Sequence, residues 1–144
     1  MGLTAARPSD SALLALQRAT HATLHLLAAE LVDLDLTASE INALANMADG
    51  RARTVSELGG AIGARPTTLT SVLDRLERRE YITRGSRRDD RRVVVIELTA
   101  SGEHVATTIR QAFSGLERRA LRELSPEAVD SFHAVLRALT EVAP

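Results

Sequence analysis

The stretch that decides the fold is TVSELGGAIGARPTTLTSVLDRLERREYITRGSRRDDRRVVVIELT, residues 54–99. Its first half contains two short helical patterns separated by Gly63, and glycine easily adopts the backbone conformation of a tight turn. Its second half contains two strand patterns on either side of the arginine-rich segment RGSRRDDRR, residues 84–92. Helix, turn, helix and β-hairpin in this order predict a winged helix-turn-helix.

Start signals delimit the two helices of this stretch. Thr54 and Glu57 form a capping box, in which both side chains satisfy free backbone N–H groups at a helix start. The second helix is expected to begin at Arg65 and Pro66, because proline is tolerated in the first helical turn. Its apolar face follows with helical spacing and consists of Leu69, Val72, Leu73 and Leu76.

The hairpin is predicted from two short runs, residues 81–84 and 93–98, which are joined by a loop. The second run contains the sequence Val93-Val94-Val95-Ile96, and consecutive β-branched residues are typical of a strand. Thr99 is then expected to cap a long helix over residues 102–122.

Helical patterns also lie on both sides of this stretch. Residues 10–31 are apolar around much of the helix circumference, which favours burial on two sides, as in a dimer interface. A second capping box, Thr37 to Glu40, opens a helix that Asp49-Gly50 ends. Ser125-Pro126 begins the last helix with the cap and the proline in their preferred order. The chain is therefore predicted to be mostly α-helical with a small β-hairpin.

Composition excludes several classes of protein. A length of 144 residues fits one domain, or one domain with an appended interface layer. The absence of cysteine rules out thiol redox sensing, disulfides and cysteine-based zinc sites. Since no glycine-rich phosphate loop, HExxH motif or framed nucleophile is found, no enzyme activity, no catalytic residue and no cofactor are predicted. Without an 18-residue apolar run or a signal peptide, the chain is expected to be soluble and cytoplasmic, with no membrane partner.

The charge of the chain is unevenly distributed. The net charge is -1, yet residues 51–92 contain eleven arginines and six acidic residues, which gives a local charge of +5. A basic block inside an acidic chain indicates a surface that binds a polyanion such as double-stranded DNA. A charged surface that only contacts solvent is the alternative.

The residue types on the second helix and on the hairpin suit contacts to DNA. Threonine and serine hydroxyls can contact base edges in the major groove, and arginines at a hairpin tip suit the narrow minor groove. The capped start of the first helix offers backbone N–H groups to phosphate. The candidate DNA-binding residues of the helices are Thr54, Arg65, Pro66, Thr67, Thr68, Thr70, Ser71 and Arg75. Those of the hairpin are Arg84, Arg87, Arg88, Arg91 and Arg92.

The segment DRRVVVIELTASG, residues 90–102, contains an Asp-x-Arg pattern, a hydrophobic strand and the pattern Leu-Thr-x-x-Gly. In this wing pattern the chain resembles the MarR (multiple antibiotic resistance regulator) family of transcriptional regulators. The second helix also resembles the family's pattern, through Thr68, Leu69, Asp74, Arg75, Leu76 and Glu77. The flanking helices, in the family's order, extend the resemblance to nearly the whole chain.

The resemblance implies a homodimer whose first and last two helices intertwine and whose winged lobes contact a pseudo-palindromic operator. It divides the chain into an N-terminal dimerisation helix (1–36), a winged helix-turn-helix DNA-binding domain (37–100) and C-terminal dimerisation helices (101–144). It implies that Arg92 reaches into the minor groove and that Asp90, as part of the DNA-binding site, helps to hold the wing. It also implies a phenolic or lipophilic small-molecule effector, bound between the dimer helices and the lobe.

Three positions depart from the family pattern. The family usually has a small polar cap where Arg65 stands and often has arginine where Ser71 stands. It often has glycine where Glu80 stands, and a non-glycine residue is strained at positive φ. These departures indicate a shifted start of the second helix, a changed pattern of base contacts and a different turn at Glu80.

The four histidines raise the question of a metal sensor. His21 and His25 lie four positions apart on the first helix, a spacing that can hold one metal ion. His104 and His133 lie in the last two helices, which could approach the first. Because no aspartate or glutamate completes a site at a motif spacing, interfacial or surface histidines are favoured, and no metal site is predicted.

Two functions stay open at this point. The first is a dimeric, ligand-responsive repressor that binds a specific operator. The second is a nucleoid-type architectural protein, which binds DNA with little sequence preference and without ligand response. The near-neutral charge of the whole chain favours the first, because architectural proteins are usually basic throughout.

Overall fold

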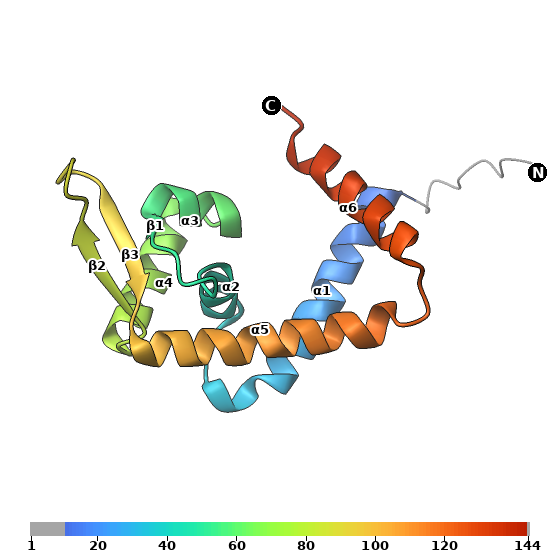
Figure 1. Cartoon of the computed structure of the whole chain (residues 1–144), viewed down its shortest axis with the longest axis horizontal. Helices are drawn as coiled ribbons and strands as arrows, with labels where there is room; N and C mark the ends of the chain where they lie inside the picture. The colour runs from blue at the N-terminus through green and yellow to red at the C-terminus, as the bar shows by residue number, and fades with distance from the viewer. Residues whose placement is uncertain (1–10, 144) are drawn as a thin grey trace, which may run out of the picture. The chain divides into compact units, whose positions relative to one another are not determined.

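The computed structural model describes residues 11–143 (Figure 1). The helices are α1 (Ala12–Glu30), the 3-10 turn η1 (Val32–Leu34), α2 (Ala38–Asn46), α3 (Val55–Ile62), α4 (Pro66–Arg78), α5 (Ala100–Leu121) and α6 (Pro126–Thr140). The strands are β1 (Arg53–Thr54), β2 (Ile82–Ser86) and β3 (Val94–Leu98). A mostly helical fold with a small antiparallel sheet confirms the predicted fold class.

The chain divides into two compact units. The first extends to Ala112 and includes α1 to β3 with the first part of α5, and the second begins at Phe113 and includes α6. Asp10, where the first helix is predicted to begin, lies outside the described residues. None of the helices within residues 11–143 has the length and apolar character needed to cross a membrane.

Aliphatic side chains from the helix-turn-helix and the sheet form the core of the first unit. The largest fully buried side chains are Leu44, Met47, Leu58, Val72, Leu73, Leu76, Ile82, Ile96 and Ile109. Complete burial of a side chain of this size contributes about 1.5–3 kcal/mol. The four apolar positions predicted on α4 are all buried, so the opposite face of α4 is left to solvent.

Both predicted capping boxes form. Thr37 Oγ1 accepts the backbone N–H of Glu40 at 3.2 Å, and Thr54 Oγ1 accepts that of Glu57 at 3.1 Å. In each box the glutamate carboxylate accepts the backbone N–H of the threonine. Gly63 ends α3 with a φ of 65°, a left-handed conformation that glycine adopts without strain.

The start of α4 is not shifted, and the expectation drawn from Arg65 is wrong on this point. Arg65 has the extended backbone of an N-cap residue, but its side chain makes no capping hydrogen bond. Pro66 occupies the first helical position, where proline has no N–H to satisfy and a φ close to the helical value. The proline therefore keeps the helix start in place without a polar cap.

The turn after α4 keeps a left-handed residue although the chain has no glycine there. Glu80 has a φ of 60°. Tyr81 N donates to Leu76 O at 3.0 Å and Glu80 N donates to Glu77 O at 2.9 Å, which is the pattern of a Schellman motif. The hydroxyl of Thr99 adds a bond to Glu80 O at 2.6 Å. The expectation of a different turn is therefore wrong, because these bonds offset the strain at Glu80.

The sheet contains three antiparallel strands in the order β1-β3-β2. The strands β2 and β3 form the predicted hairpin, in which Ile82 pairs with Leu98, and each strand starts one residue later than predicted. The strand β1 pairs with the other edge of β3. It was not predicted, because two residues are too few to show the alternating pattern of a strand.

Gly102 marks a close approach between α5 and the base of the hairpin. A Cβ atom at this position would overlap with the carbonyl oxygen of Tyr81. The same carbonyl accepts the backbone N–H of Thr99 at 3.0 Å, so it cannot move away without the loss of that bond. Packing, and not a positive φ, therefore requires the glycine of the Leu-Thr-x-x-Gly pattern.

We expect Gly102→Ala to lower the free energy of unfolding by at least about 2 kcal/mol, because the added methyl group forces the backbone to shift. Gly60→Ala is the matched control, since apart from the adjacent residues and the backbone of α3 itself no atom lies within 4 Å of the corresponding Cβ position. Alanine in a helix interior should stabilise the chain there by up to about 1 kcal/mol. Urea unfolding followed by circular dichroism measures both. Unchanged stability of Gly102→Ala would show that the approach is not restrictive.

Candidate nucleic-acid interface

The helix α4 presents a row of hydroxyl side chains to solvent. Thr67, Thr68, Thr70 and Ser71 are exposed, while the opposite face packs into the core. The hydroxyl of Thr70 donates to Pro66 O at 2.9 Å, which leaves its methyl group and its oxygen lone pairs for other contacts. The structure thus brings these predicted residues together in the first two turns of α4. Hydroxyl and methyl groups so placed can read base edges.

Arg75 is held by a buried carboxylate. Its Nε donates to Oε1 of Glu40 at 2.5 Å, and Glu40 is 3% exposed. The other oxygen of Glu40 accepts the backbone N–H of Thr37 in the α2 capping box. The Arg75 side chain is still 40% exposed. Glu40 therefore fixes the direction of a guanidinium whose terminal nitrogens donate to no residue within 11–143.

Arg84 connects the hairpin to α4. Its guanidinium donates to Asp74 at 2.8 Å and to both carboxylate oxygens of Glu77 at 3.0 Å. Glu77 first, and Asp74 second, raise the pKa of Arg84 above its usual value, and Arg84 in turn lowers the pKa of Glu77. Sequence reasoning places Arg84 among the DNA contacts, whereas the structure places it between β2 and α4 with its charge compensated. The two acidic partners were missed, although their spacing on one helix face was an available signal.

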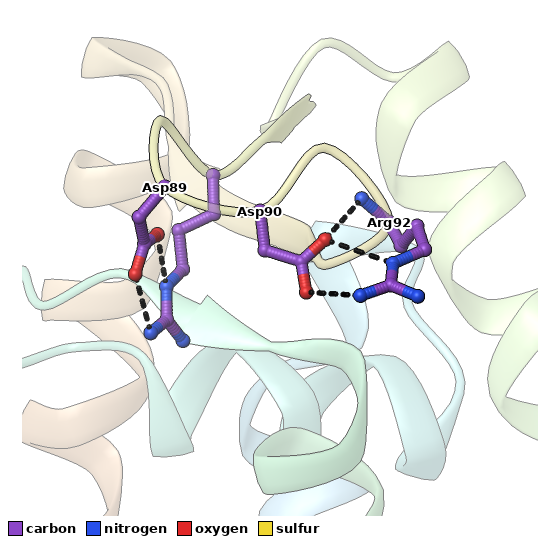
Figure 2. Close-up of polar contacts among 4 residues, drawn as sticks. Asp89, Asp90 and Arg92 are labelled. Atoms are coloured by element: carbon purple, nitrogen blue, oxygen red, sulfur yellow. Dashed lines mark hydrogen bonds and ion pairs between the residues drawn. The ribbon is translucent and has the colours of Figure 1, made fainter.

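Two local carboxylates organise the loop between β2 and β3 (Figure 2). Asp90 Oδ1 accepts the backbone N–H of Arg92 at 3.0 Å and its Nε at 3.2 Å. Asp89 accepts two bonds from Arg87, at 2.7 and 3.0 Å. These bonds lower the pKa of both carboxyls, that of Asp90 through the side chain and then the backbone of Arg92. The Asp90 carboxylate thus closes a turn with the backbone two residues ahead.

Several cations near this loop and at the start of α4 remain available to a polyanion. The Arg92 side chain is 92% exposed although it contacts Asp90. Arg88, Arg91 and Arg65 are exposed, and within the described part of the chain no acidic side chain pairs with them. Thr54 is half-buried and its hydroxyl caps α3, so it orders the start of that helix.

We expect the pKa of Asp90 to rise toward its usual value in the Arg92→Ala chain, because the Arg92 side chain is the first cause of its depression. The rise should be partial, since the backbone N–H of residue 92 still donates. A carboxyl with a lowered pKa stabilises the folded loop above the unfolded pKa, and that contribution is lost as the pH falls through the folded value.

Carboxyl-carbon NMR titration measures this pKa, and Asp89, which Arg87 holds, is the internal control. The Asp89 value should be the same in both chains. An Asp90 pKa that does not respond to the substitution would show that the Asp90–Arg92 pair does not form in solution.

Comparisons with known proteins agree with this geometry. A sequence model of the MarR family matches residues 36–94. YfiV of Bacillus subtilis (strain 168), described as an uncharacterized HTH-type transcriptional regulator, is 27% identical over 111 residues, which are 77% of this chain and 69% of that protein. The chain is similar in fold to the crystal structure of a mutant MarR from E. coli complexed with operator DNA. That similarity has a TM-score of 0.71 at 23% identity and covers 86% of this chain and 89% of that chain.

A second solved structure extends the agreement over more of the chain. Bordetella bronchiseptica BpsR, solved to describe the regulation of its DNA binding by 6-hydroxynicotinic acid, has a TM-score of 0.79 at 20% identity. The similarity covers 95% of this chain and 98% of the BpsR chain. The similar structures confirm the winged-helix fold, and the family model matches α2 to the start of β3. Over residues 36–94 the chain therefore matches the MarR family of transcriptional regulators.

Proposed function

We propose that this chain represses transcription by binding a pseudo-palindromic operator as a homodimer, and that a small-molecule effector releases it. The observation that carries the proposal is the ion-paired link of Arg84 to Asp74 and Glu77. This link joins the hydroxyl face of α4 and the arginine-rich wing, the β2–β3 hairpin with its loop, into one surface. Such a surface can engage two grooves of one DNA duplex together.

Each element of this surface has a proposed role. The helix α4 lies in the major groove and reads bases through Thr67, Thr68, Thr70 and Ser71, with Pro66 at the groove edge. The start of α3, ordered by Thr54, receives a phosphate. Arg92 enters the minor groove, where negative potential attracts guanidinium groups. The residues that neutralise phosphates are Arg65, Arg75, Arg87, Arg88 and Arg91. Arg84 and Asp90 position the wing.

The homodimer is supported by apolar side chains that one chain leaves uncovered. On α1, Leu13 and Leu26 are 50% and 54% exposed, and on α6, Phe132 and Val135 are 49% and 48% exposed. No described residue of α6 is buried. Helices with this much uncovered apolar surface need a partner, and a second copy of the chain supplies the same surface. We assign residues 1–36 and 101–144 to this dimer interface and residues 37–100 to DNA binding.

An effector can act only by favouring one state of the dimer. A ligand with equal affinity for the DNA-binding state and the released state would shift nothing. We propose that it favours a spacing of the two lobes that no longer matches successive major grooves. BpsR, whose DNA binding is regulated by 6-hydroxynicotinic acid, supports the choice of a small aromatic molecule. The architectural alternative requires no such ligand.

Selection of bound sequences from a random duplex pool at near-physiological salt tests the proposal. We expect a palindromic motif with half-sites about one helical turn apart, bound at least about a thousandfold tighter than scrambled DNA. Steep salt dependence without an enriched motif would assign the architectural role instead. The recovered duplex then serves in a screen for compounds that release it.

We expect Arg92→Ala to weaken binding to the selected duplex by at least about tenfold and to reduce the slope of log affinity against log salt by about 1, because one cation leaves the DNA surface. Arg110→Ala is the matched control, since Arg110 is an exposed arginine of α5 outside the proposed surface. Fluorescence anisotropy at several salt concentrations measures both chains. Equal binding by Arg92→Ala and the unchanged chain would contradict the assignment of the wing.

We expect the unchanged chain to sediment as a dimer and Phe132→Glu to sediment as a monomer, because a charge on α6 opposes burial of its apolar face. Val94→Glu places the same charge on an exposed apolar residue of the wing and should leave the dimer intact. Sedimentation equilibrium over a range of concentrations compares the three chains. A dimer that survives Phe132→Glu would exclude α6 from the interface.

A further inference from the structure

We infer that His21 and His25 form a binding site on α1 for one divalent transition-metal ion of the Cu2+ or Zn2+ type. The inference goes beyond DNA binding and does not depend on it. Both side chains are exposed in the single chain, and their Nε2 atoms lie 3.1 Å apart. The two rings have centroids 4.5 Å apart and planes inclined by 75°.

The separation of the two nitrogen atoms is the one that chelation of a single ion needs. An imidazole nitrogen lies about 2.0–2.1 Å from Zn2+, so two ligands of a tetrahedral ion are about 3.3 Å apart and two ligands at a right angle are about 2.9 Å apart. The observed 3.1 Å lies between these values. An ion beside the line that joins the two Nε2 atoms can therefore contact both with little change in their separation, once the rings turn so that both lone pairs point at it.

The helix α1 holds the two histidines close together before any ion binds. Residues four positions apart lie on the same side of an α-helix, and α1 continues for a full turn beyond each histidine. In the metal-free pair the Nε2 of one ring donates to the Nε2 of the other. The metal ligand is the neutral imidazole nitrogen, so the ion takes the place of the shared proton. Sequence favoured interfacial or surface histidines because no carboxylate completes a site at a motif spacing, and the spacing does not show that the two Nε2 atoms converge.

The composition around the pair defines what kind of site it is. Among residues 11–143 no third histidine and no carboxylate joins the pair to form a larger cluster. Water therefore completes the coordination, as in sites with open positions. The chain has no cysteine, so no thiolate competes for the ion. Imidazole ligands suit copper and zinc, and Cu2+ binds most tightly among the divalent first-row ions.

Titration of the untagged full chain with CuCl2, followed by visible absorbance and electron paramagnetic resonance, tests the inference. We expect one ion per chain with the signature of two imidazole nitrogens. His21→Gln and His25→Gln should each weaken binding by at least about tenfold, because one ligand of a linked pair is lost. In a second readout, ZnCl2 should raise the melting temperature of the unchanged chain but of neither variant.

A relocated pair provides the matched control. Thr23→His combined with His25→Thr keeps the composition of α1 but places the two histidines two positions apart, on different sides of the helix. This chain should bind as weakly as the single variants, while His104→Gln and His133→Gln should bind as tightly as the unchanged chain. Full affinity in the relocated pair or in His25→Gln would overturn the inference and leave the two rings with only their mutual hydrogen bond.

Discussion

The backbone of one residue, Tyr81, joins the helix α4, the wing and α5. Its N–H donates to Leu76 O, and its carbonyl accepts the N–H of Thr99 at the end of β3. The same carbonyl is the atom that Gly102 of α5 approaches too closely for any side chain. Arg79, whose guanidinium lies 5.1 Å from the Tyr81 ring centroid, also donates to backbone carbonyls at the end of η1. Movement of the wing relative to α4 would break at least one of these contacts.

Arginines of the basic block differ in the contacts that they make within the chain. Arg84 and Arg75 are paired with carboxylates of α4 and α2, and those pairs connect elements within the first unit. Arg88 and Arg91 lie in the loop of the wing and pair with no acidic side chain among the described residues, and Arg92 is 92% exposed although it contacts Asp90. The number of arginines in the block therefore overstates how many cations a duplex would meet, because some of them are already paired with carboxylates. Buried or partly buried pairs are also screened less by salt than exposed charges are.

The features that sequence could predict are those whose cause is local. The capping boxes at Thr37 and Thr54 and the proline start of α4 depend on residues within one turn of each other, and all three form. The features that it missed need partners from distant segments. The strand β1 exists only because β3 lies beside it, and the left-handed Glu80 is held by Thr99, which lies nineteen positions away.

The same distinction between local causes and distant partners applies to the candidate site. Exposure of the hydroxyl side chains on α4 follows from the apolar spacing on the opposite face, and the sequence therefore predicted it. The pairing of Arg84 with Asp74 and Glu77 depends on how β2 packs beside α4, and charge patterns alone could not separate it from a DNA contact. Residue type thus identified the basic surface, whereas tertiary packing decided which of its arginines are already paired with carboxylates of the same chain.

The contact of Glu40 with Arg75 has a consequence for any attempt to change what this protein recognises. A transplant of another regulator's α4 residues into this chain would replace the residue at position 75. Glu40, which lies 35 positions earlier on α2, would stay. Where the incoming residue is not a cation, Glu40 would be buried without a cationic partner, a costly arrangement. Positions 40 and 75 therefore have to be chosen together, and a redesign of what α4 contacts must exchange both residues.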